Sequence, residues 1–126
     1  MDAKTLNTTA LAFMGDAVYE QFIREKVILS GKVPGGRADM QHKAAVKYVC
    51  AGAQAAAVKA MIDSGFLREE EIALVKRARN HKVGTKARSA DMVTYKWATA
   101  FEALLGYLYL DGRSERLKEV LEKAYE

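Results

Sequence analysis

The near-absence of proline is the feature that most constrains how this chain can fold. Pro34 is the one proline in 126 residues. Proline breaks the interior of helices, and the glycines here lie mostly between segments whose apolar residues recur at helical spacing. No strand pattern of comparable strength competes. The sequence therefore predicts an all-α fold, and its length fits one domain that covers residues 1–126.

Apolar periodicity and helix-end residues predict six helices, over about 8–29, 38–50, 52–63, 69–82, 91–111 and from 114 onward. Thr8 or Thr9 is expected to cap the first of them, because threonine side chains accept bonds from free amides. The run Glu69-Glu70-Glu71 predicts a helix start, since acids suit that end of the dipole. The inward face of the first helix is expected to carry Leu11, Met14, Val18, Phe22 and Leu29.

Charge and cysteine content narrow the class of protein. The formal net charge of +4 favours an anionic partner, of which nucleic acid is the commonest. The one cysteine, Cys50, is expected in the core and excludes an intrachain disulfide and a thiolate zinc cluster. Asp16 interrupts the first apolar run and Glu102 the most apolar one, so we expect no signal peptide or membrane span. A soluble, cytoplasmic protein is the expectation.

Two acids stand alone in apolar segments. Asp16 is the only charged residue between Lys4 and Glu20, and Glu102 is the only one between Lys96 and Asp111. A carboxylate removed from water is costly unless something compensates it. The small residues beside both acids would let two helices approach, so the acids would converge if those helices cross. Two carboxylates with an open side are a good Mg²⁺ site, which makes the pair a candidate catalytic centre.

The alternative is that each acid is satisfied locally and serves only the fold. Glu20 and Arg24 are one helical turn apart and are expected to form the more favourable ion pair, which leaves Asp16 without Arg24 as its partner. The residue pattern alone does not decide between a metal site and local compensation. The local partners would be Arg24 or a tyrosine hydroxyl for Asp16, and Thr99, Lys96 or Tyr107 for Glu102.

A basic stretch follows the predicted fourth helix, with no acid from Lys76 to Ala90. It lacks interleaved aromatic residues that would stack on single-stranded bases, so it suits the backbone of a nucleic-acid duplex better. Cations at a helix end that only complement its dipole are the simpler explanation for the first two residues alone. The candidate RNA-binding residues are Lys76, Arg77, Arg79, Lys82, Lys86 and Arg88.

Two motifs give the chain a family resemblance. Phe13-Met14-Gly15-Asp16-Ala17-Val18 resembles the ribonuclease III signature, and Phe101-Glu102-Ala103-Leu104-Leu105-Gly106 resembles the second motif of that family. Both occur in the family's order near opposite ends of a helical chain. The sequence ends soon after the second motif, so we expect no double-stranded-RNA-binding domain. It thus resembles the Mini-III ribonucleases, the compact bacterial branch of the family, over essentially its full length.

The resemblance implies an all-helical homodimer that cleaves double-stranded RNA with magnesium and leaves 5′-phosphate and 3′-hydroxyl ends. For the Mini-III branch the implied substrate is the precursor of the large-subunit (23S) ribosomal RNA, and a ribosomal protein could act as a helper. By motif match, Asp16 takes the position of the catalytic aspartate, and Glu102 takes that of the metal-binding glutamate.

The chain also departs from ordinary ribonuclease III, which carries four acids around the metal. Ala12 and Thr99 stand at two of those positions, so the expected site is reduced to Asp16 and Glu102. This departure favours a rival function, a non-catalytic RNA-binding or ribosome-assembly module on the same fold. A helical protein-interaction adaptor is a third alternative, and it predicts no salt-sensitive RNA binding.

Overall fold

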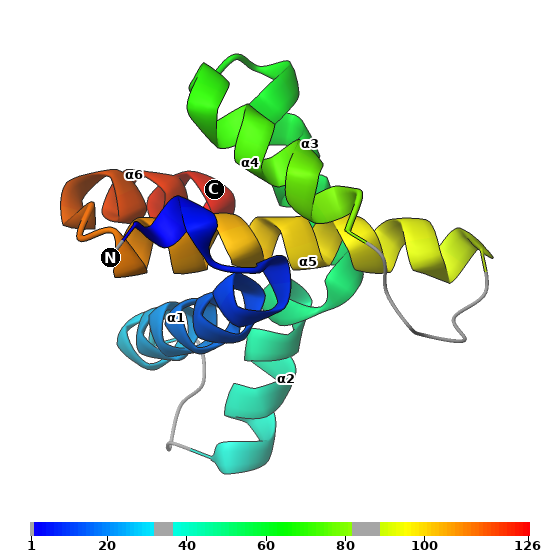
Figure 1. Cartoon of the computed structure of the whole chain (residues 1–126). Helices are drawn as coiled ribbons and strands as arrows, with labels where there is room; N and C mark the ends of the chain where they lie inside the picture. Colours follow the sequence, from blue (N-terminus) through cyan, green and yellow to red (C-terminus); the bar gives the residue numbers. More distant parts are fainter. Residues whose placement is uncertain (1, 32–36, 82–88) are drawn as a thin grey trace.

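The computed structural model describes residues 2–31, 37–81 and 89–126, and every regular element in them is a helix (Figure 1). The predicted all-α fold is therefore confirmed. A short 3₁₀ helix, η1, precedes the α-helices. The elements are η1 (Ala3–Thr5), α1 (Thr8–Leu29), α2 (Ala38–Val49), α3 (Ala51–Asp63), α4 (Glu69–Arg79), α5 (Ser89–Leu110) and α6 (Ser114–Tyr125).

Helix α5 is the centre of the molecule, with α1, α3, α4 and α6 packed around it (Figure 1). Its residues 103–108 are all buried, as expected for a helical segment that is apolar all round. Phe101 of α5 meets Tyr19 of α1 edge to face, with ring centroids 4.9 Å apart. This packing fixes α1 against α5, the two helices that carry the lone acids.

Several sequence expectations need correction at the helix ends. Asn7, and not Thr8 or Thr9, caps α1, because its side-chain oxygen accepts a hydrogen bond of 2.8 Å from the amide of Ala10. Helix α4 ends at Arg79, before the predicted Lys82. Cys50, expected in the core, is exposed in the extended turn between α2 and α3.

The expected inward face of α1 is also partly wrong. Leu29 is 74% exposed, whereas the buried positions follow a face rotated from the predicted one. Apolar residues lie on more than one side of this helix, so periodicity alone could not choose the buried side. The buried residues of α1 are Thr8, Leu11, Ala12, Gly15, Tyr19, Ile23 and Val27.

No helix in the described part of the chain is long and apolar enough to cross a membrane.

Candidate active site

Two glycines bring the backbones of α1 and α5 into contact. A Cβ atom on Gly15 would collide with the backbone carbonyl of Glu102, and one on Gly106 would collide with that of Leu11. Only a residue without a side chain allows this approach. Because Asp16 follows Gly15 directly, the crossing places the two lone acids beside each other.

Asp16 and Glu102 interact through their carboxyl groups. Asp16 is exposed, Glu102 is partly buried, and the two side chains share a hydrogen bond. Burial, followed by the negative charge of Asp16, raises the pKa of Glu102 to about 8, and the more distant Glu20 adds to the effect. Without a cation, the pair therefore keeps a proton at neutral pH. Two separate carboxylates would already have lost it, because their ordinary pKa values are about 4.

The acids face an open cavity of about 420 Å³. Helix α1, the C-terminal end of α4 with His81 just after it, and the part of α5 from Tyr95 to Glu102 supply its walls. Ala12 and Thr99, the positions where ordinary ribonuclease III has further acids, both lie in this wall and leave it without those carboxylates. The lining residues are Thr9, Ala12, Phe13, Asp16, Ala78, His81, Tyr95, Lys96, Thr99 and Glu102.

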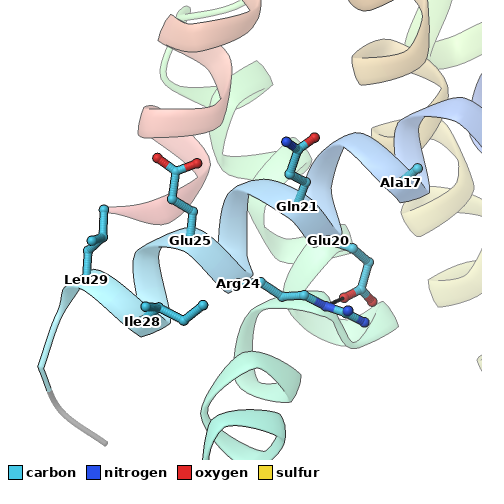
Figure 2. Close-up of a pocket in the computed structure, with 7 residues that line it drawn as sticks. All are labelled: Ala17, Glu20, Gln21, Arg24, Glu25, Ile28 and Leu29. Atoms are coloured by element: carbon cyan, nitrogen blue, oxygen red, sulfur yellow. Dashed lines mark ion pairs between the residues drawn. The ribbon is translucent and has the colours of Figure 1, made fainter. Parts of the chain in front are cut away.

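Local cations do not neutralise the pair in the described residues. Arg24 forms its ion pair with Glu20, at 3.4 Å, as the helical spacing predicted (Figure 2). Across residues 2–31, 37–81 and 89–126, no ion pair includes Asp16 or Glu102. The alternative in which a basic side chain seals each acid thus finds no support there.

Gln54 is a residue of the site that sequence reasoning missed. It lies on α3, is 3% exposed, and its Nε2 donates a 3.2 Å hydrogen bond to the Val49 carbonyl. Its side chain also hydrogen-bonds Glu102 and lowers the pKa of that carboxyl, against the stronger opposing effects of burial and Asp16. Gln54 is the only polar residue of the run Ala53–Ala57, a signal that could have drawn attention to it.

The two carboxylates fit a magnesium ion. Mg²⁺ prefers hard oxygen ligands, needs only one or two protein carboxylates, and keeps several waters or takes phosphate oxygens. A pair that shares a proton beside an open cavity offers those oxygens and the room. The described residues contain no group of three or more His, Cys, Asp or Glu side chains that could form a larger metal cluster.

The predicted basic stretch divides over two sides of α4. Arg77 turns toward the N-terminal segment, where its guanidinium donates a 2.9 Å hydrogen bond to the Lys4 carbonyl. Arg79 turns to α5, with its guanidinium carbon 4.9 Å from the centre of the Trp97 ring. Lys76 is exposed on the same helix. The remaining candidates, Lys82, Lys86 and Arg88, lie outside the described residues.

A second hollow follows the exposed face of α1 and continues away from the acids (Figure 2). Ile28 and Leu29 are 62% and 74% exposed, and Phe13, on the rim of the acidic cavity, is 81% exposed. A patch of large apolar side chains exposed on one face of a helix is typical of an interaction surface.

Comparison with known proteins identifies the family of this chain. The family model for the ribonuclease III domain matches residues 9–113, which include both acids. The chain therefore belongs to the ribonuclease III family and is an endoribonuclease of that family.

Within this family, the chain is similar to the Mini-ribonuclease 3 proteins. The one from Brevibacillus brevis is 44% identical over 124 residues, 98% of this chain and 89% of the relative. The one from Thermoanaerobacter is 48% identical over 118 residues, 94% of this chain and 80% of the relative. The crystal structure of protein FN1578 from Fusobacterium nucleatum is 33% identical, with a TM-score of 0.79 over 96% of this chain and 93% of the other.

Proposed function

We propose that this chain is a magnesium-dependent endoribonuclease that cleaves double-stranded RNA, with Asp16 and Glu102 as its catalytic and metal-binding residues. The observation that carries the proposal is the acid pair itself. Two carboxylates from helices far apart in sequence share a hydrogen bond beside an open cavity, without an ion-pair partner among the described residues. The whole of residues 1–126 would form the catalytic domain.

In this proposal Asp16 and Glu102 would hold Mg²⁺ through their carboxylate oxygens. The bound ion would supply positive charge that activates water and stabilises charge on the scissile phosphodiester. Gln54, whose side chain lowers the pKa of Glu102, would help to orient that carboxylate. Lys96 and His81 line the same cavity and can donate hydrogen bonds to phosphate oxygens of the substrate.

The duplex would be held by the basic residues around the end of α4, Lys76, Arg77, Arg79, Lys82, Lys86 and Arg88. Among them Arg79 lies close to the cavity wall, since its neighbour Ala78 is part of that wall. These cations would contact phosphates and would read no base sequence.

The exposed face of α1 supports a homodimer. Phe13 lies at the acidic cavity and Ile28 near the far end of the helix, so a second copy that covers this face would bury both. Two acid pairs related by a twofold axis would then cut the two strands of one duplex. The proposed substrate, through the family resemblance, is the precursor of 23S ribosomal RNA in the cytoplasm, with a ribosomal protein as a candidate helper.

The test is incubation of the purified protein with an end-labelled RNA duplex, with Mg²⁺ or with chelator. We expect cleavage only with Mg²⁺, and 5′-phosphate ends on the products. Asp16→Asn should bind the duplex but cleave it at least about a hundredfold more slowly. Asp63→Asn, the same change at an exposed acid at the end of α3, is the matched control and should cleave normally.

The rival function, a non-catalytic RNA-binding or ribosome-assembly module, gives a different result in the same experiment. It predicts intact duplex with and without Mg²⁺ while binding is retained. An Asp16→Asn variant that cleaves at the wild-type rate would remove Asp16 from the proposed mechanism.

A further inference from the structure

Two cationic side chains lie over the ring of the only tryptophan in the chain. Trp97, on α5, is partly exposed. The Nζ atom of Lys59 on α3 lies 5.3 Å from the centre of its ring, and the guanidinium carbon of Arg79 on α4 lies 4.9 Å from it. Three helices thus bring two positive charges to one indole, the aromatic system that attracts cations best.

The two cations differ from the other cations that lie over aromatic rings. Lys26, Arg113, Arg116 and Lys123 each contact a ring and also pair with a carboxylate, at 2.7, 2.7, 2.7 and 3.3 Å. Within the described ranges, Lys59 and Arg79 have the ring contact and no carboxylate partner. Two like charges near one ring repel each other, and an anion from outside the chain would relieve that repulsion.

Two members of this cluster, Arg79 and Trp97, are next in sequence to residues that line the acidic cavity. Trp97 follows Lys96, and Arg79 follows Ala78, and both of these neighbours line the cavity wall. The Nε of Arg79 donates a 3.2 Å hydrogen bond to the Asn80 side chain, and its terminal amino groups have no hydrogen-bond acceptor within residues 2–31, 37–81 and 89–126. A guanidinium with free terminal groups is well suited to two oxygens of one phosphate.

We propose that Lys59 and Arg79, held in place on the Trp97 ring, form a phosphate-binding site for the RNA duplex beside the acid pair. This inference rests on the proposed function, since it assigns part of the substrate to a second place on the same molecule. The ring limits the freedom of both long side chains before RNA arrives, so less conformational entropy is lost on binding. Lys59 and Trp97 lie outside the basic stretch, and their role comes only from the fold.

The experiment measures duplex binding in chelator, where the wild-type protein can bind but not cleave. Lys59→Gln should bind roughly three- to tenfold more weakly than wild type, and its salt dependence should lose about one phosphate contact. Lys118→Gln, on the exposed side of α6, removes the same charge and is the control, with wild-type affinity expected. Thermal unfolding of both variants checks that the fold is intact.

A second readout uses Trp97 itself, because it is the one source of tryptophan fluorescence. Duplex RNA should change its emission with the same midpoint as binding, and this midpoint should shift in Lys59→Gln but not in Lys118→Gln. Equal affinity and salt dependence for the two variants, or unchanged emission at saturating duplex, would overturn the phosphate site.

The phosphate site and the proposed function can fail separately. If the two variants bind equally but the wild-type protein cleaves the duplex in Mg²⁺, the phosphate site is wrong and the proposed function still stands. If Lys59→Gln alone binds more weakly but the wild-type protein does not cleave in Mg²⁺, the phosphate site stands and the proposed nuclease function is wrong.

Discussion

Glu71 and Glu102 are both glutamates largely removed from water, but their surroundings shift the two pKa values in opposite directions. Glu71 on α4 is 1% exposed, and its carboxylate accepts hydrogen bonds of 2.7 and 2.8 Å from Arg116 and 2.8 Å from the Arg68 amide. Burial raises the pKa of Glu71, but these donors prevail and the pKa is lowered. Glu102 has Asp16 as its neighbour, and its pKa is raised to about 8.

The difference teaches that burial of an acid does not by itself mark a functional site. The Glu71 carboxylate has its partner within the fold and joins α4 to α6. The Glu102 carboxylate is next to a second acid and an open cavity, and a cation from solution would complete it. The missing partner, more than the burial, distinguishes the proposed endoribonuclease site from a structural ion pair.

The largest effect is expected from Arg116→Leu, which leaves the buried Glu71 carboxylate without its partner. We expect a loss of about 3–5 kcal/mol in the free energy of unfolding, measured by urea denaturation at neutral pH. The double variant Glu71→Leu/Arg116→Leu should lose less, because no charge is left unpaired. A single variant as stable as wild type would show that the ion pair does not hold α4 to α6.

Gly15→Ala should have the second-largest effect on stability, since its Cβ atom would collide with the Glu102 backbone. Forced separation of α1 from α5 should cost about 2–3 kcal/mol of stability and should slow RNA cleavage, because the acid pair would part. Gly52→Ala on α3 is the matched control. Nothing lies within 4 Å of its added Cβ, so it should stabilise the protein by about 0.5–1 kcal/mol. Equal effects at the two glycines would contradict a tight crossing.

Glu102→Gln tests the raised pKa in the presence of chelator. A raised pKa means that protonated Glu102 stabilises the fold fully below the ordinary glutamate pKa, and that this contribution is lost as the pH rises through about 8. The variant stays neutral, so its free energy of unfolding should rise relative to that of wild type by about 1–3 kcal/mol between pH 5 and pH 9. This magnitude is reduced to allow for the partial exposure of Glu102.

Glu71→Gln should show the opposite trend. A lowered pKa means that the charged Glu71 stabilises the fold above the ordinary glutamate pKa and that this contribution is lost as the pH falls. The variant should therefore be less stable than wild type at neutral pH, and the gap should narrow in acid. Parallel pH profiles for the two variants would refute the contrast between the two glutamates.

Gln54→Leu should give the smallest change, about 1 kcal/mol of stability, because one buried hydrogen bond to the Val49 carbonyl is lost. Since Gln54 lowers the pKa of Glu102, the variant should move that pKa further up. Carbon-13 NMR of the Glu102 carboxyl during a pH titration measures the shift. Gln21→Leu, at an exposed position of α1, is the control and should leave the titration unchanged.

The sequence was sufficient to predict six helices and to select Asp16 and Glu102, because an isolated charge in an apolar helix is visible without a structure. It could not show which side of α1 is buried, since that choice depends on the contact of Gly15 and Gly106 with another helix. Small residues beside the acids only suggested such a contact.

The residues whose roles the sequence does not reveal have a common feature. Glu71 is one of three acids at a helix start, and its burial depends on Arg116, 45 residues further along the chain. Gln54 carries no charge and lies among alanines, so its bond to Glu102 becomes visible only when α3 packs on α5. The Lys59 and Arg79 contacts with Trp97 likewise join three helices. Local patterns do not reveal interactions between distant segments.

Paramagnetic broadening of backbone amide NMR signals by Mn²⁺, which occupies the same kind of oxygen site as Mg²⁺, tests the central claim most directly. At low Mn²⁺ concentration we expect selective loss of the signals around Asp16 and Glu102, reversed by excess Mg²⁺, with the signals around Glu71 and Arg116 retained. Broadening that spares Asp16 and Glu102, or that persists unchanged in the Asp16→Asn/Glu102→Gln double variant, would contradict a cation site at the acid pair.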